Sequence, residues 1–182
     1  MDRAADAAVP PAGDTPVIDP PVADPPVIEL AEVVAVIGAF PALAGATLRV
    51  GAGEIVLLRG PNGAGKTTVL RVCAGLLPIV RGEGRVLGLD LATQRDTIRR
   101  RVGLLGHANG LYADLTVAEN VRFWGATVNA TDDEVAGALG RLALAGRLAE
   151  VPVRRLSAGQ RRRTALACLV ARRAELWLLD EP

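Results

Sequence analysis

The sequence of 182 residues is poor in aromatic side chains, in cysteine and in net charge. Aromatic residues make up 3% of the chain, too few for the stacking platforms that bind single-stranded nucleic acids. The formal net charge is only +1, so we expect no global attraction to nucleic acid or lipid. The two cysteines, Cys73 and Cys168, lie in apolar helical stretches, which favours buried thiols in a reducing compartment over a disulfide or metal pair.

Long apolar runs are also missing. The N-terminus carries Asp2 and Asp6 and then prolines, without the apolar region of a secretory signal. The longest uncharged stretch, residues 33–48, is shorter than the roughly 20 residues that span a bilayer, and glycine and proline interrupt it. It is more typical of two strands joined by a turn. We therefore expect a cytoplasmic chain whose membrane contact is made through a partner.

The chain divides into a tail and a folded domain. Residues 1–27 are rich in proline, alanine and aspartate, which predicts a disordered or polyproline-like tail. From residue 28 the pattern is that of an α/β domain. We expect strands at residues 54–59, 84–89, 102–105 and 175–179, and helices at residues 66–77, 93–101 and 158–172. This alternation indicates a largely parallel sheet with ligands at the carboxyl ends of its strands.

Two capping boxes follow the third expected strand. In Thr116–Glu119 and Thr131–Glu134 a hydroxyl caps the helix start, and a glutamate three residues later reaches back. They predict a small all-helical insert at about residues 115–155.

Residues 60–67 form a complete G-x-x-x-x-G-K-[ST] motif. Its glycines allow backbone N–H groups to surround phosphate oxygens, and the following helix adds the positive end of its dipole. The motif predicts that Lys66 meets the β- and γ-phosphates, that the Thr67 hydroxyl ligates Mg²⁺, and that Thr68 helps to hold the α-phosphate. The candidate nucleotide-binding residues are Asn62, Gly63, Ala64, Gly65, Lys66, Thr67 and Thr68.

The C-terminal residues complete this site. Residues 176–179 are apolar and predict a central strand buried on both faces. Asp180 follows at the tip of the strand, where its carboxylate can hold the magnesium shell. Glu181 is placed to orient the attacking water as general base.

A third motif points to a family. Residues 156–160, Leu-Ser-Ala-Gly-Gln, resemble the L-S-G-G-Q signature of ATP-binding-cassette (ABC) proteins, with Ala158 in place of the first glycine. The resemblance covers residues 28–182 and implies a P-loop NTPase of ABC type: a mostly parallel core sheet, a small antiparallel portion and a helical insert. It also implies that MgATP lies between two nucleotide-binding domains of a homodimer. Ser157, Gly159 and Gln160 would then reach the γ-phosphate held by the other subunit.

The resemblance can be narrowed to the haem-exporter ATP-binding subunits of cytochrome c maturation, the CcmA family. It is carried by residues 105–107, 110–112 and 115–120, and by residues 156–163 and 176–182. It implies haem export with integral membrane transporter subunits as partners, on the inner face of the cell membrane. The alternatives are the ATPase of a drug, lipid or polysaccharide exporter, a soluble non-transport ABC ATPase, and a non-catalytic nucleotide-binding module.

The chain departs from the ABC pattern at three places. His107 stands where most members have a glutamine that touches Mg²⁺ and the attacking water. An imidazole can form a hydrogen bond with the water but is a poor Mg²⁺ ligand. A catalytic role and a structural role for His107 therefore both stay open. Ile37 holds the usual position of the adenine-stacking ring, and Phe40 is a candidate substitute or a core residue. The chain stops at Pro182, and we expect a C-terminally truncated domain of low activity.

Five arginines surround the signature: Arg154, Arg155, Arg161, Arg162 and Arg163. A face for nucleic acid is conceivable, since arginine contacts phosphate. The resemblance instead implies a place near the nucleotide and the dimer interface, so no nucleic-acid partner is expected.

Overall fold

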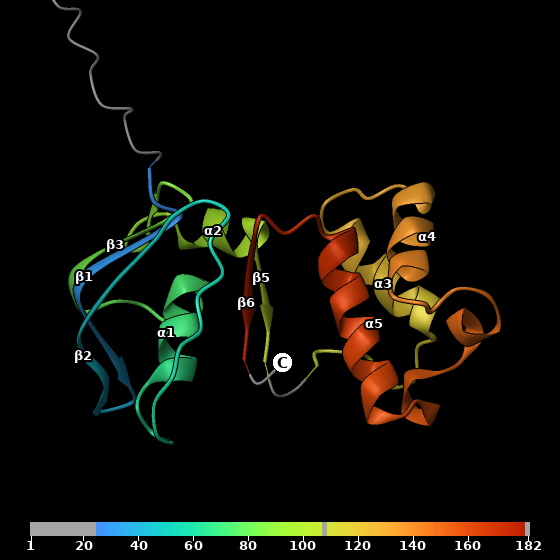
Figure 1. Ribbon diagram of the computed structural model, residues 1–182, viewed down its shortest axis with the longest axis horizontal. Coiled ribbons are helices and arrows are strands. Elements are labelled where there is room, and N and C mark those ends of the chain that lie inside the picture. Colours follow the sequence, from blue (N-terminus) through green and yellow to red (C-terminus); the bar gives the residue numbers. More distant parts are fainter. Residues whose placement is uncertain (1–24, 107–108, 181–182) are drawn as a thin grey trace, which may run out of the picture.

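The computed structural model describes residues 25–106 and 109–180. Most of the predicted N-terminal tail, as well as His107 and Glu181, lies outside the described residues. Figure 1 shows an antiparallel sheet at one end of the molecule, a helical insert at the other, and a parallel pair of strands between them. The predicted α/β fold, with a parallel portion, an antiparallel portion and a helical insert, is confirmed. Among the described residues, however, the antiparallel sheet has four strands and the parallel pair two, whereas the sequence predicted a mostly parallel sheet.

The antiparallel sheet has the strand order β2-β1-β3-β4. Its strands are β1 (Ile28–Ile37), β2 (Phe40–Val50), β3 (Arg81–Val86) and β4 (Leu89–Asp90). Residues 33–48 therefore form parts of two strands joined by a tight turn, as predicted. The strand expected at residues 84–89 is in fact the end of β3, a turn and the start of β4. Alternate residues of β1, such as Ile28 and Leu30, are buried against the core, as a half-buried strand requires.

The strand predicted at residues 54–59 is wrong. This segment has no regular secondary structure, and Ile55 and Leu57 are 100% and 69% exposed. A strand is stabilised by hydrogen bonds and side-chain contacts with a neighbouring strand, not by its apolar composition alone. Within the described part of the chain, no strand pairs with these residues.

The middle of the molecule contains α1 (Lys66–Cys73), α2 (Arg95–Arg101) and the parallel pair β5 (Val102–Leu105) and β6 (Leu176–Leu179). Helix α1 ends earlier than predicted. Gly75 follows it with φ 70°, and a Cβ there would lie 2.9 Å from the Arg95 carbonyl oxygen. A shared core joins this layer to the antiparallel sheet through Leu30, Val72, Ile98 and Leu178.

The prediction that the last strand is buried on both faces is also wrong. In β6 Leu178 is 5% exposed, but Trp177 is 41% exposed. Strand β5 is the only partner of β6 among the described residues, so β6 lies at an edge there.

The helical insert has its own core, packed against the last long helix. Its elements are α3 (Val117–Ala126), α4 (Asp132–Arg141), η1 (Gly146–Glu150) and η2 (Val153–Arg155), followed by α5 (Ala158–Ala171). Both predicted capping boxes are confirmed, at Thr116 with Glu119 and at Thr131 with Glu134. The Thr116 and Thr131 backbone N–H groups donate to these carboxylates and lower the pKa of each glutamate.

Cys73 and Cys168 are both buried and free, as predicted. Burial raises the pKa of each thiol to about 12, so neither is a reactive thiolate at neutral pH. Among residues 25–106 and 109–180, no helix is long and apolar enough to cross a membrane.

Candidate functional site

The candidate site begins with the loop of residues 60–65 and the first residues of α1. The Lys66 Nζ donates to the carbonyl oxygens of Gly60 and Pro61, each at 2.9 Å. These bonds place the ammonium group of Lys66 against the loop that precedes α1. Lys66 is also the only lysine in the chain.

Gly65 allows this loop to join α1. It caps the helix with φ 84°, a left-handed conformation that favours glycine. A Cβ at this position would also lie 2.9 Å from Leu43 Cδ2 and 3.2 Å from the Ala42 carbonyl oxygen on β2. The antiparallel sheet thus fixes where the loop turns into the helix.

Thr67 and Asp180 meet although 113 residues separate them. The Thr67 hydroxyl lies 2.9 Å from Asp180 Oδ2 and 3.2 Å from Oδ1, and it donates to this carboxylate. Asp180 is placed there by β6, and its backbone N–H extends the parallel ladder by donating to the Leu105 carbonyl at 2.8 Å. The two residues assigned to magnesium from the sequence therefore share one site.

This pair suits a magnesium ion by the chemistry of its donors. Mg²⁺ prefers oxygen ligands and is commonly held by one or two carboxylates, a few waters and substrate phosphates. Thr67 provides a hydroxyl and Asp180 a carboxylate, and the two groups are hydrogen-bonded to each other. Among the described residues there is no cluster of three or more His, Cys, Asp or Glu that could hold a metal by protein groups alone.

The other residues predicted for the phosphate loop lie on the same turn. Asn62, Gly63 and Ala64 are exposed, whereas Thr68 is 9% exposed at the start of α1. Phe40 is 78% exposed, so it is not a core residue, and the alternative of a core role is excluded. It pairs across the β1–β2 turn with Ile37, the other residue considered for adenine.

The signature segment, residues 156–160, forms the start of α5. The Gln160 backbone N–H donates to Ser157 Oγ at 3.2 Å, and the Ser157 backbone N–H donates to Gln160 Oε1 at 2.9 Å. This reciprocal capping box was missed from the sequence, although its S-x-x-Q spacing could have revealed it. No hydrogen bond joins this segment to Lys66, Thr67 or Asp180 in the described part of the chain.

Arg162 is a site residue that sequence reasoning placed only in a basic cluster. Its Nη1 donates to the Gly106 carbonyl at 2.9 Å and to Asn109 Oδ1 at 3.2 Å, and its Nη2 donates to the Asp180 carbonyl at 3.2 Å. One guanidinium on α5 thus binds the residues that follow β5 and β6. No sequence pattern indicates these contacts, because they depend on how α5 packs across the strand ends.

The five arginines near the signature do not form one basic surface. Arg154 pairs with Asp114 at 2.5 Å, and Arg163 donates to the Leu142 and Ala143 carbonyls at 3.2 and 3.3 Å. With Arg162 at the strand ends, three of the five make contacts within the domain.

Comparison with known proteins identifies the family. Residues 43–182 match the model of the family described as "ABC transporter", so the chain belongs to this family. Proteins named "Cytochrome c biogenesis ATP-binding export protein CcmA" are 43% identical over 132 residues in Vibrio parahaemolyticus and 45% identical over 150 residues in Paramagnetospirillum magneticum. These alignments cover 71% and 80% of this chain. The chain spans 64% and 68% of the length of the two relatives.

Solved structures give the same result. A dimeric post-hydrolysis state of an ATP-binding cassette bound to ADP and Pi has a TM-score of 0.75 and 26% identity, with 85% of this chain and 74% of that chain covered. The ATP-binding subunit of an ABC transporter has a TM-score of 0.75 and 28% identity, with 86% and 66% covered. The resemblance inferred from the three motifs is therefore confirmed at the level of the family.

Proposed function

We propose that this chain is the ATP-binding subunit of an ABC transporter and that it binds and hydrolyses MgATP at an interface between two copies. The observation that carries the proposal is the contact between the Thr67 hydroxyl and the Asp180 carboxylate. It joins the phosphate loop to the last strand at the carboxyl end of a parallel pair, the usual place for a ligand in such sheets.

Each residue has a role in this proposal. Lys66 binds the β- and γ-phosphates, and the backbone of residues 62–65 surrounds the phosphate oxygens together with Thr68. Thr67 and Asp180 hold Mg²⁺, which neutralises charge on the phosphates when it is bound. Glu181 orients the attacking water, and His107 is a second candidate for contact with that water.

The second copy completes the site. Ser157, Gly159 and Gln160 lie at the start of a 14-residue helix, whose positive dipole end suits an anion. Among the described residues no hydrogen bond joins them to the Thr67–Asp180 pair, which supports a role toward the nucleotide of another subunit. The related cassette named above as dimeric and bound to ADP and Pi supports the same arrangement.

Our proposal for the transported species rests on the names of the relatives. Those named as cytochrome c biogenesis export proteins support haem export for cytochrome c maturation, with integral membrane subunits as partners and a position at the inner face of the cell membrane.

The nucleotide site can be tested through the chain's single lysine. An amine-reactive acyl reagent should modify Lys66 and the N-terminal amine, and mass spectrometry of the two peptides follows each separately. Saturating MgATP is expected to protect Lys66 at least fivefold, while the N-terminal amine, a control in the same molecule, reacts at an unchanged rate. Equal labelling of Lys66 with and without MgATP would overturn the nucleotide-site proposal.

The magnesium role has a matched pair of variants. Thr67→Ala should weaken MgATP binding by about tenfold, because it removes one contact to the metal ion. Thr67→Ser keeps the hydroxyl and should therefore keep the affinity. Equal affinities for the two variants in calorimetry would remove Thr67 from the metal site.

Haem export is tested in the cell. A Lys66→Ala allele of the gene should abolish covalently attached haem in c-type cytochromes, measured by peroxidase staining of gels. Normal c-type cytochromes together with loss of another exported compound would favour the drug, lipid or polysaccharide alternative.

A further inference from the structure

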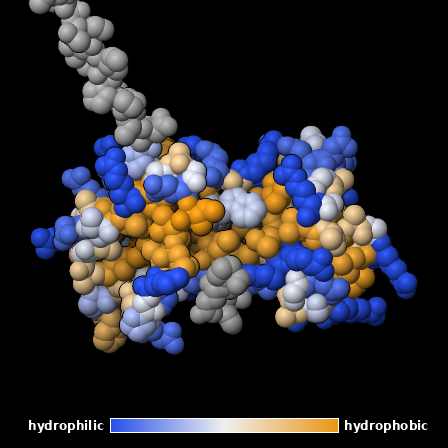
Figure 2. All heavy atoms as spheres, viewed as in Figure 1, coloured by the Kyte–Doolittle hydropathy of each residue, from blue (hydrophilic) through white to orange (hydrophobic). Residues whose placement is uncertain are grey.

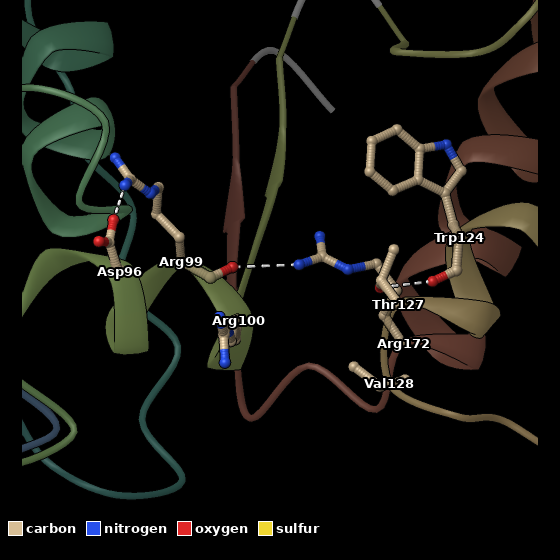
Figure 3. A pocket seen from close by; sticks show the side chains of 7 residues that line it. All are labelled: Asp96, Arg99, Arg100, Trp124, Thr127, Val128 and Arg172. Carbon is tan, nitrogen blue, oxygen red and sulfur yellow. Dashed lines mark hydrogen bonds and ion pairs between the residues drawn. The ribbon is translucent and has the colours of Figure 1, made fainter.

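A cleft of about 270 Å³ lies between α2 and the helical insert, away from the candidate nucleotide site. Helix α2 contributes Asp96, Arg99 and Arg100, α3 contributes Trp124, and the end of α5 contributes Arg172 (Figure 3). Helix α2 leads into β5 and α5 leads into β6, whereas Asp180 lies where β6 ends. Four strand residues, about 13 Å, separate the two ends.

The charges that line this cleft are unbalanced. Three arginines and one aspartate line it, which gives a net charge of +2. Asp96 is already engaged in an ion pair with Arg99. Arg100 is exposed, and its side chain has no ion pair or hydrogen bond within residues 25–106 and 109–180. The unpaired positive charge therefore comes from Arg100 and Arg172.

Arg172 is held across the cleft with one donor unused. Its Nη2 donates to the Arg99 carbonyl at 3.1 Å, and Figure 3 shows the guanidinium extending from α5 toward α2. Its Nε is buried and has no hydrogen-bond partner among the described residues. Burial also lowers the pKa of this guanidinium. A buried donor without a partner calls for an explanation, and a bound water or ion beside it is one.

Trp124 gives the cleft an apolar wall. The Arg172 guanidinium lies 5.7 Å from the centroid of its ring, in the range of a cation–π contact. An indole beside the Arg172 guanidinium, in a cleft that Arg100 also lines, suits a ligand with one anionic end and one apolar or ring-shaped end.

We propose that this cleft is a second ligand site, which binds a small phosphate monoester with its phosphate on Arg100 and Arg172 and its organic part on Trp124. A phosphate monoester carries close to two negative charges at neutral pH, which matches the lining charge of +2. Arginine also offers several donors in a geometry that fits phosphate oxygens. The volume is below that of most sites for drug-sized ligands, which selects a small compound over a nucleoside triphosphate.

Such a ligand would join two parts of the molecule. Arg100 belongs to α2, whereas Trp124 belongs to α3 and Arg172 caps the end of α5, and we call α3, α4 and α5, which share one core, the helical bundle. A phosphate held by both arginines adds to the existing Arg172–Arg99 contact, so binding is expected to stabilise the packing of α2 against the bundle.

The chain contains only two tryptophans, so Trp124 can report on the cleft directly. In a Trp177→Phe, Lys66→Ala background, phenyl phosphate should change the fluorescence of Trp124 in a saturable way. Arg100→Gln is expected to raise the Kd about tenfold, and Arg172→Gln at least as much. Arg147→Gln, an exposed arginine outside the cleft with the same charge change, is the matched control and should leave the Kd unchanged.

This background lacks Lys66, so a fluorescence response to phenyl phosphate is not due to Lys66 in the phosphate loop. The absence of that response would therefore contradict the cleft proposal, whereas the absence of Lys66 protection by MgATP would contradict the nucleotide-site proposal. Arg100 is exposed on α2, so Arg100→Gln is expected to fold normally, and circular dichroism with a thermal-shift assay on the chain with Trp177 intact checks this. No saturable response to phenyl phosphate, an equal effect of Arg147→Gln, or a response only to vesicles containing phosphatidic acid would overturn the proposal.

Discussion

Two segments of this chain have similar sequences, identical at three of five positions, but different structures. Glu54-Ile-Val-Leu-Leu precedes the phosphate loop, and Glu175-Leu-Trp-Leu-Leu precedes Asp180. The second contains β6, whose four residues pair with β5. The first has no regular secondary structure, and most of its residues are exposed. Figure 2 shows hydrophobic residues gathered across the middle of the face in view.

The glutamates that begin the two segments, Glu54 and Glu175, differ in their contacts. Glu175 accepts hydrogen bonds from Arg101 Nε and Nη2 at 2.6 and 2.5 Å, so it joins the start of β6 to the residue that precedes β5. In the described part of the chain, the Glu54 carboxylate accepts a hydrogen bond only from the Gly51 backbone N–H, three residues away, at 2.8 Å. A strand forms where a neighbouring strand provides hydrogen bonds and contacts, and apolar composition alone does not make one.

The largest expected effect is at the buried residue of β6. Leu178 is 5% exposed within the main core, so Leu178→Ala should lower the free energy of unfolding by about 2–5 kcal/mol. Urea denaturation followed by circular dichroism measures this. A loss below about 1 kcal/mol would mean that β6 is no better packed than residues 55–58.

A smaller effect is expected at the Arg101–Glu175 pair. Hydrogen bonds from Arg101 lower the pKa of Glu175 below its ordinary value of 4.5, so this pair stabilises the fold at neutral pH. That contribution is lost as the pH falls below about 4.5 and through the lowered pKa, because the unfolded chain then binds the proton more readily.

Both side chains are more than one third exposed, so Glu175→Gln should cost at most about 1 kcal/mol at pH 7. It should also flatten the fall in stability on acidification, as measured by denaturation at several pH values. If the free energy of unfolding of the variant falls with pH as steeply as that of the parent chain, the Arg101–Glu175 pair does not contribute to the stability of β6.

The smallest effect is expected in the exposed segment. Ile55 is 100% exposed, so Ile55→Ser should change the free energy of unfolding by less than about 0.5 kcal/mol. The same urea measurement applies. A loss comparable with that of Leu178→Ala would show that residues 55–58 are packed in solution, and the contrast between the two segments would fail.

The sequence predicted best those features that depend on near neighbours. The capping boxes at Thr116 and Thr131, the turn within residues 33–48 and the start of the helix after Gly65 were predicted correctly, because a few adjacent residues determine them. The strand at residues 54–59 failed because a strand depends on a distant partner, which local composition does not reveal.

For the candidate site, too, the sequence predicted the motif residues but not the contacts that depend on packing. The motifs assigned Thr67 and Asp180 to one magnesium site, and their contact supports this assignment. The contacts of Arg162 and the cleft around Arg172 were not predictable, since both depend on how α5 packs against other elements. The Ser157–Gln160 cap could have been predicted from its spacing.

The position of Arg162 along α5 divides this helix into two unequal lever arms. Arg162 is fixed to both strand ends, five residues from Ser157 and ten from Arg172. At 1.5 Å per residue the arms measure about 7.5 and 15 Å, so a rigid tilt about Arg162 moves the far end roughly twice as far as the signature end. A displacement of Ser157 would therefore be doubled at Arg172, while the spacing of the strand ends at the pivot stays the same.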